Sequence, residues 1–171
     1  KSYELYHLEM VKKGSGKAPE IYLMEGFMDV IAAYRAGIEN AVASMGTALT
    51  SEHVEHLKRF TKKVIVTYDG DKAGQAATAK ALDELKDIPV QVVQIPDAMD
   101  PDEYLQKNSP QDLAYLLTNT RISPVEFYIH HFRPENSENL QAQIEFIEKI
   151  APLIAKEPSI TEIGRASCRE R

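Results

Sequence analysis

Short apolar runs alternate with segments of helical periodicity through the first half of this 171-residue chain, and this alternation limits the fold more than any other feature. The runs predict strands, and they alternate with helical segments of about ten to fifteen residues. Such a chain folds through right-handed β-α-β units into a mostly parallel sheet with helices on its faces. The four predicted strands are residues 21–24, 41–45, 64–68 and 90–95.

The strand pattern stops after Pro96, and the rest of the chain predicts helices only, at residues 101–105, 111–117, 124–132 and 140–154. We therefore expect an α/β fold, in which a mostly parallel four-stranded sheet flanked by helices is followed by a small helical subdomain. The expected divisions are the end of a preceding segment with a linker at 1–20, the α/β domain at 21–96, the helical subdomain at 97–160 and a tail at 161–171.

The tail, the overall charge and the lack of long apolar runs exclude some functions. Residues 164–171, G-R-A-S-C-R-E-R, have no apolar periodicity and are typical of sequence of cloning origin, so the single Cys168 is not a candidate functional residue. A net charge of −6 argues against a protein that coats nucleic acid by bulk electrostatics. No apolar run approaches the ~20 residues that span a bilayer, so we expect no membrane partner.

Two acidic motifs follow predicted strands. E-G-F-M-D places Glu25 at the end of the first strand and Asp29 in the first turn of the next helix, and the third strand ends in Asp69-Gly70-Asp71. Simpler explanations exist, since a helix dipole favours Asp29 and Asp71 can cap a helix. The carboxyl ends of parallel strands nevertheless share one edge, where ligands bind. The pairing of the motifs therefore predicts four carboxylates in one crevice.

Carboxylates gathered at one point repel one another unless a divalent cation neutralises them. Oxygen ligands without a His or Cys cluster favour Mg²⁺, or Mn²⁺ in its place, over zinc. These ions commonly bridge to phosphate oxygens, so the pattern indicates phosphoryl or nucleotidyl transfer. The expected metal ligands are Glu25, Asp29, Asp69 and Asp71, and the catalytic candidates among them are Glu25, Asp69 and Asp71.

A third acidic stretch and a basic cluster are further candidates. Asp100 and Asp102 flank Pro101 at a helix start, which explains them by capping, but they also follow the fourth strand and can face the same crevice. The basic residues form either a solvated helix end or contacts to phosphates. They are Lys58, Arg59, Lys62 and Lys63 before the third strand, and Lys72 after the aspartate pair.

E-G-x-x-D at the end of one predicted strand and D-G-D at the end of another resemble the Toprim domain shared by bacterial primases, topoisomerases, some nucleases and recombination mediators. The stretches at 25–50, 68–77 and 100–105 look like DnaG-type bacterial primase, and S-P-V-E-F-Y-I at 123–129 continues the likeness. The resemblance covers roughly residues 3–160. It implies a metal ligand or general acid/base at Glu25, a metal-binding pair at Asp69 and Asp71, completion of the first motif by Asp29, and acids near the active site at Asp100 and Asp102.

The resemblance also implies a function, the synthesis of short RNA primers from ribonucleoside triphosphates on single-stranded DNA in the bacterial cytoplasm. The zinc-ribbon Cys/His set, basic subdomain and helicase-binding domain of this family have no counterpart in the sequence. We therefore expect zinc and the replicative helicase to bind domains outside this chain, and the chain alone to polymerise weakly or not at all. The alternatives are phosphodiester cleavage, as by a Toprim nuclease or topoisomerase, and a Toprim-like interaction module without catalysis.

Overall fold

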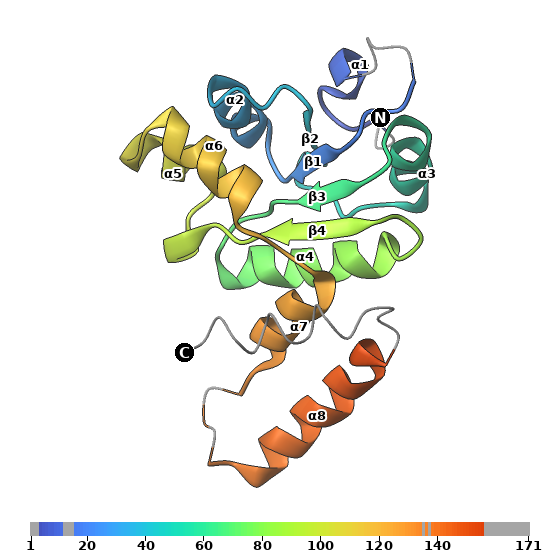
Figure 1. Ribbon diagram of the computed structural model, residues 1–171, viewed down its shortest axis with the longest axis vertical. Coiled ribbons are helices and arrows are strands. Elements are labelled where there is room, and N and C mark those ends of the chain that lie inside the picture. The colour runs from blue at the N-terminus through green and yellow to red at the C-terminus, as the bar shows by residue number, and fades with distance from the viewer. Residues whose placement is uncertain (1–3, 12–15, 135, 137, 156–171) are drawn as a thin grey trace. The chain divides into compact units, whose positions relative to one another are not determined.

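A five-stranded sheet with the order β2-β1-β3-β4-β5 is the framework of the chain, shown in a computed structural model (Figure 1). The strands are β1 (Ile21–Met24), β2 (Ala41–Ala43), β3 (Val64–Val66), β4 (Val90–Val93) and β5 (Arg121–Ile122). The first four are parallel, because β1 pairs with β2 and β3, and β3 pairs with β4. The predicted α/β class is confirmed. The predicted number of strands is wrong, because β5 has only two residues and lacks an apolar run.

The structure describes residues 4–11, 16–134, 136 and 138–155, and it divides into two compact units between Arg121 and Ile122. The first unit contains α1 (Leu8–Val11), α2 (Phe27–Arg35), α3 (Ser51–Phe60), α4 (Lys72–Glu84), a 3-10 turn (Pro96–Ala98), α5 (Pro101–Lys107) and α6 (Pro110–Asn119). The second contains α7 (Pro124–Phe132) and α8 (Leu140–Ile154), which pack on each other. None of the described helices is long and apolar enough to cross a membrane. The predicted tail at 161–171 lies outside the described residues.

Helices α5 and α6 pack with the sheet. Their buried leucines join the apolar cluster formed by α2 and the strands, and these leucines are Leu105, Leu113, Leu116 and Leu117. The observed division at residue 121 therefore differs from the predicted one at residue 96. The reason is that the apolar faces of both helices are buried in the α/β unit, which the helical pattern alone does not reveal.

The strands bury both faces of the sheet. Tyr22 and Met24 of β1 share a cluster with α2, α5 and α6, whereas the alternate residues Ile21 and Leu23 are buried on the opposite face. The chain passes from β1 through α2 to β2 on one side, and then through α3 to β3 on the other side of β1. Right-handed crossovers therefore place α2 and α3 on opposite faces. The direction of winding reverses between the neighbours β1 and β3.

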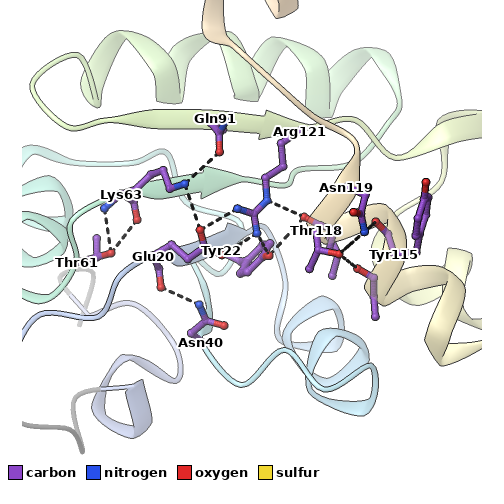
Figure 2. Close-up of polar contacts among 12 residues, drawn as sticks. Glu20, Tyr22, Asn40, Thr61, Lys63, Gln91, Tyr115, Thr118, Asn119 and Arg121 are labelled. Carbon is purple, nitrogen blue, oxygen red and sulfur yellow. Dashed lines mark hydrogen bonds and ion pairs between the residues drawn. The ribbon is translucent and has the colours of Figure 1, made fainter.

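A polar network around Arg121 joins the amino ends of the strands (Figure 2). The guanidinium donates two hydrogen bonds to the Glu20 carboxylate, at 2.8 and 2.7 Å, and others to the carbonyl of Leu117 and the hydroxyl of Tyr22. Lys63, just before β3, forms an ion pair with Glu20 at 3.3 Å. The hydrogen bond from Arg121 is the main reason that the pKa of Glu20 lies below its ordinary value. The network thereby connects β1 and β3 to the end of α6.

We expect Arg121→Met to lower the free energy of unfolding by about 2 kcal/mol, because it leaves the partly buried Glu20 carboxylate without its main partner. Lys58→Met is the matched control, because it removes an exposed ion pair with Glu55 and should lower the free energy of unfolding by less than about 0.5 kcal/mol. Urea denaturation at pH 7 measures both. Equal losses in the two variants would contradict a stabilising role for the network.

Candidate metal and catalytic site

Glu25 and Asp69 lie at the carboxyl edge of two adjacent strands. Glu25 follows β1 directly, Asp69 follows β3 by three residues, and the two strands are paired in parallel. The amide of Thr67 donates to the carbonyl of Leu23 at 2.8 Å, which carries this pairing toward the acids. The winding reverses at this pair of strands, and ligand crevices of parallel sheets open at such points. The sequence predicted the common edge but not that these two strands are neighbours.

Each of these two carboxylates has a buried oxygen without a hydrogen-bond partner, Oε1 of Glu25 and Oδ1 of Asp69. Burial raises the pKa of Glu25, and the charges of Asp69 and Asp71 raise it further. Burial also raises the pKa of Asp69, with further contributions from the charges of Asp100, Asp71 and Glu103. Unsatisfied buried acceptors are rare in folded proteins and indicate an unseen partner such as an ion. Two oxygens of this edge are thus available to a ligand.

Three further acids use one carboxylate oxygen each to begin a helix. Hydrogen bonds run from the Gly26 amide to Asp29 Oδ2 at 2.9 Å, from the Gly74 amide to Asp71 Oδ1 at 2.7 Å, and from the Glu103 amide to Asp100 Oδ1 at 2.6 Å. The helix-start explanation of these acids is therefore confirmed. Each carboxylate has a second oxygen that these bonds do not use, so capping is compatible with binding a cation.

Asp29 is the most enclosed of the acids, with 5% of its surface exposed. Burial raises its pKa to about 7, and the negative charges of Asp100 and Asp69 act in the same direction, while the hydrogen bond from the Gly26 amide opposes them. Asp100 and Asp69 are therefore close enough to Asp29 for their charges to affect its pKa. That the three acidic stretches form one site stays a prediction.

The raised pKa of Asp29 predicts how stability depends on pH. Asp29 is harder to ionise in the folded chain than in the unfolded chain, so stability falls as the pH rises from about 4 to about 7. We expect Asp29→Asn, in EDTA, to raise the free energy of unfolding at pH 8 by on the order of 2 kcal/mol, with a clearly smaller gain at pH 5. Urea denaturation at both pH values measures this. Asp87→Asn, at an exposed acid, is the control, and a pH-independent gain for Asp29→Asn would contradict the assignment.

Gly70 holds the third acidic stretch against the second motif. Its amide donates to the carbonyl of Met99 at 2.8 Å, and a Cβ on Gly70 would lie 2.1 Å from the carbonyl oxygen of Ile95. Residues 97–98 between these two contacts have left-handed backbone, with φ of 57° and 54°. Asp100 follows directly as the cap of α5. The backbone contact at Gly70 therefore positions Asp100, which a turn signal in the sequence does not reveal.

Two residues outside the predicted site set also contribute. Glu103, from the third acidic stretch, lies in the first turn of α5, and its charge adds to the burial that raises the pKa of Asp69. Gly74 lies in the first turn of α4, where a Cβ would be 2.2 Å from the carbonyl oxygen of Asp69. The available signal was the second glycine of D-G-D-K-A-G, in a helix start that does not otherwise require one. The predicted acid Asp102 lies beside Glu103. The Oδ2 atom of Asp102 accepts a hydrogen bond from Gln106 Nε2, also in α5, at 2.8 Å.

The predicted basic cluster does not reach this edge. All four of its residues precede β3 and so lie toward the amino ends of the strands, opposite the acids, and these are Lys58, Arg59, Lys62 and Lys63. Lys63 is engaged there by Glu20, at 3.3 Å. Lys72 is different, because it is the first residue of α4 and follows Asp71 directly. Of the five predicted phosphate contacts, only Lys72 lies at the acidic edge.

The donor set fits a hard cation, although its side chains do not already surround one. Within the described part of the chain, no group of three or more His, Cys, Asp or Glu side chains is arranged to hold a metal ion. The site acids are nevertheless all oxygen donors, and two of them have unpaired buried oxygens. Burial first, and then the charges of neighbouring carboxylates, raise the pKa values of Glu25 and Asp69, and a divalent cation would offset both effects. The ligand set Glu25, Asp29, Asp69 and Asp71 stays a prediction.

Comparison with known sequences identifies the domain type. Residues 22–105 match a family described as Toprim-like. A DNA primase of Lactococcus lactis is 55% identical over 161 residues, which are 94% of this chain and 25% of the relative. A DNA primase of Listeria monocytogenes is 42% identical over 156 residues, with 89% and 25% covered. The chain thus spans about a quarter of the length of these curated relatives.

Solved primase structures share the fold. The RNA polymerase domain of Mycobacterium tuberculosis primase DnaG has a TM-score of 0.77 and 28% identity, with 97% of this chain and 55% of that one covered. A DnaG primase catalytic domain bound to single-stranded DNA has a TM-score of 0.73 and 26% identity, with 98% and 56% covered. Primases and other Toprim proteins generally use a divalent metal, which agrees with the acidic residues at this edge of the sheet. The sequence identities, the Toprim-like region and the shared fold together show that the chain belongs to the DnaG-type DNA primase family, as a Toprim-containing part of the catalytic core.

Proposed function

We propose that this chain supplies the metal-binding carboxylates of a primase active site, in a parent protein that makes short RNA primers from ribonucleoside triphosphates on single-stranded DNA. One observation carries the proposal. Glu25 and Asp69 lie on adjacent parallel strands where the winding reverses, and each has a buried oxygen without a partner. The primase relatives and the single-stranded DNA bound in one similar structure support DNA as the template.

Glu25, Asp69 and Asp71 are the proposed ligands of Mg²⁺, for which Mn²⁺ substitutes, and Asp29 completes the set. When bound, the cation neutralises phosphate charge and helps align the attacking 3′-hydroxyl, the α-phosphate and the pyrophosphate leaving group. Asp29 fixes the start of α2 beside Glu25 through the Gly26 amide. Lys72, as the first residue of α4, is the proposed phosphate contact at this edge.

The remaining functions belong to other parts of the parent polypeptide, of which this chain represents about a quarter in the curated relatives. A similar structure from Aquifex aeolicus, described as containing zinc-binding and RNA polymerase domains, matches this chain over 40% of its length. This supports a zinc site outside the chain. We likewise propose that other parts of the parent grip the template and bind the replicative helicase, and that the parent acts in the bacterial cytoplasm. The chain alone is expected to bind the cation but to polymerise weakly or not at all.

The test is ribonucleotide incorporation on single-stranded DNA by a catalytic core that joins this chain to the preceding part of its parent. We expect Mg²⁺-dependent primer synthesis that falls by at least about 100-fold in Asp69→Asn. Glu55→Gln, on the outer face of α3, is the matched control and should keep full activity. DNA nicking without primer synthesis would replace the proposal by a Toprim nuclease or topoisomerase. A folded core that catalyses neither primer synthesis nor nicking would indicate an interaction module.

A further inference from the structure

Glu25 has a polar neighbour on each adjoining strand. Strand β1 lies between β2 and β3 (Figure 1), and their register, continued past the strand ends, aligns Glu25 with Ser44 on one side and with Tyr68 on the other. The pairing does continue, because the Ser44 amide donates to the Met24 carbonyl at 3.1 Å, and the Thr67 amide extends the pairing of β3 with β1 in the same way. Aligned residues of neighbouring strands share a face of the sheet. The three side chains therefore lie on the same face.

Tyr68 and Ser44 interact across Glu25. A hydrogen bond joins the side chains of Tyr68 and Ser44, and the charge of Glu25 also acts on Tyr68. Strands β2 and β3 are two strand spacings apart, which is about 10 Å. A hydrogen bond between side chains of these two strands, on one face, has to pass over the β1 residue between them. The Tyr68 ring therefore crosses the stem of Glu25, and we call this contact the Tyr68–Ser44 bridge.

The bridge is buried and uncharged. Tyr68 is 5% exposed and Ser44 is 6% exposed. Burial raises the pKa of Tyr68 to about 12, although the hydrogen bond with Ser44 opposes this, so the hydroxyl is neutral at pH 7. The bridge thus adds no charge to the acidic edge. A buried ring beside the stem of Glu25 also excludes some of the conformations that this side chain could otherwise adopt.

The carboxylate of Glu25 is held but not saturated. A hydrogen bond from the Asp69 backbone reaches this carboxylate, whereas its Oε1 atom is buried and has no hydrogen-bond partner. The side chain is therefore confined by the Tyr68 ring and by the backbone of β3, with one oxygen left for a ligand. A side chain ordered in this way loses less conformational freedom when a cation binds.

We propose that Tyr68, anchored on Ser44, is a positioning residue that orients the Glu25 carboxylate for a divalent cation. The inference rests on the proposed function, because it concerns a ligand of the proposed metal site. Tyr68 acts through Glu25 and does not contact the cation. Removing a group that orients a metal ligand typically lowers metal affinity by about 10- to 100-fold. A residue that only fills the core would instead change stability and leave the affinity of the folded chain unchanged.

Mn²⁺ binding to this chain, followed by electron paramagnetic resonance of the free ion, tests the proposal. Tyr68→Phe keeps the ring and removes the hydroxyl. Ser44→Ala removes the partner of that hydroxyl, and it keeps the test open if Tyr68→Phe does not fold. Tyr22→Phe is the matched control, because it removes a buried tyrosine hydroxyl at the other end of β1, where Tyr22 bonds to Arg121. Circular dichroism selects the folded variants.

We expect Tyr68→Phe and Ser44→Ala each to raise the Kd for Mn²⁺ about 10-fold. The double variant should raise it no further, because both changes break the same bridge. Tyr22→Phe should leave the Kd unchanged. An unchanged Kd in Tyr68→Phe would overturn the proposal, and so would losses that multiply in the double variant.

Crystals grown without a divalent cation provide a second measure, which does not depend on metal binding. Glu25 should have a single side-chain conformer in the unchanged chain and several conformers in Tyr68→Phe. The same single conformer in both crystals would show that Tyr68 does not position Glu25. If the unchanged chain binds no Mn²⁺, the proposed function is contradicted, and the crystals still decide whether Tyr68 orients this side chain.

Discussion

Gly70→Ala is expected to lower the free energy of unfolding by about 3 kcal/mol, because the new methyl group overpacks a backbone contact. The Cβ would lie 2.1 Å from the carbonyl oxygen of Ile95 and 3.2 Å from that of Met99. Both are main-chain atoms, so rotation of a side chain cannot relieve the overlap. The segment from β4 to α5 has to move away, and Asp100 moves with it. The same variant should therefore weaken cation binding as well as folding.

Gly37→Ala provides the control for Gly70→Ala. Gly37 has a φ of 85°, but no atom lies within 4 Å of a Cβ built there. The change introduces only backbone strain, which we expect to lower the free energy of unfolding by about 1 kcal/mol. Urea denaturation of both variants measures the difference. If Gly70→Ala loses no more stability than Gly37→Ala, the result would contradict the close packing of the Asp69-Gly70-Asp71 turn on residues 95–99.

The combined change Asp69→Asn and Asp71→Asn is expected to abolish stabilisation by divalent cations. In the unchanged chain, a cation at 100 times its Kd should raise the free energy of unfolding by about 2.7 kcal/mol, because it binds only the folded site. The double variant removes two charges of the proposed ligand set. The amide oxygen introduced by Asp71→Asn can still accept the hydrogen bond that Asp71 receives from the Gly74 amide. Without cation the melting temperature should therefore stay the same or rise as repulsion is relieved.

Thermal unfolding across a Mg²⁺ or Mn²⁺ titration checks this second prediction. Asp83→Asn combined with Asp87→Asn removes the same number of charges outside the acidic edge, and it should keep the full cation response. A response that survives the change at Asp69 and Asp71 would show that the cation binds elsewhere. The absence of any response in the unchanged chain would contradict the proposed metal site itself.

Much of the fold was predictable because burial leaves a direct mark on the sequence. The central strands are covered on both faces, so they appear as continuous apolar runs such as V-I-V at 64–66. Strand order leaves no such mark, and the adjacency of β1 and β3 emerged only in the structure. The two residues of β5 are too few to form a pattern. Helices α5 and α6 have ordinary amphipathic spacing, which does not say which partner covers them.

The candidate site was predictable as far as residue type and strand edge. Glu25 and Asp69 were proposed because two acidic motifs follow strands of one parallel sheet, but their unpaired oxygens depend on packing. The role of Gly70 could not be predicted, because its close contact is with Ile95, which is distant in sequence. The error about the basic cluster before β3, in contrast, could have been avoided from the sequence. Its position at the amino end of a parallel strand already placed residues such as Lys63 away from the acids.

The most direct test of the proposed metal site is the anomalous diffraction of Mn²⁺ in crystals of this chain. We expect an anomalous peak at the carboxyl edge of β1 and β3, about 2.1 Å from oxygens of Glu25 and Asp69. Asp71 should contribute a further oxygen, and crystals of the Asp69→Asn and Asp71→Asn double variant should lack the peak. Saturating Mn²⁺ that leaves this edge empty, or that binds only at the amino ends of the strands, would contradict the account.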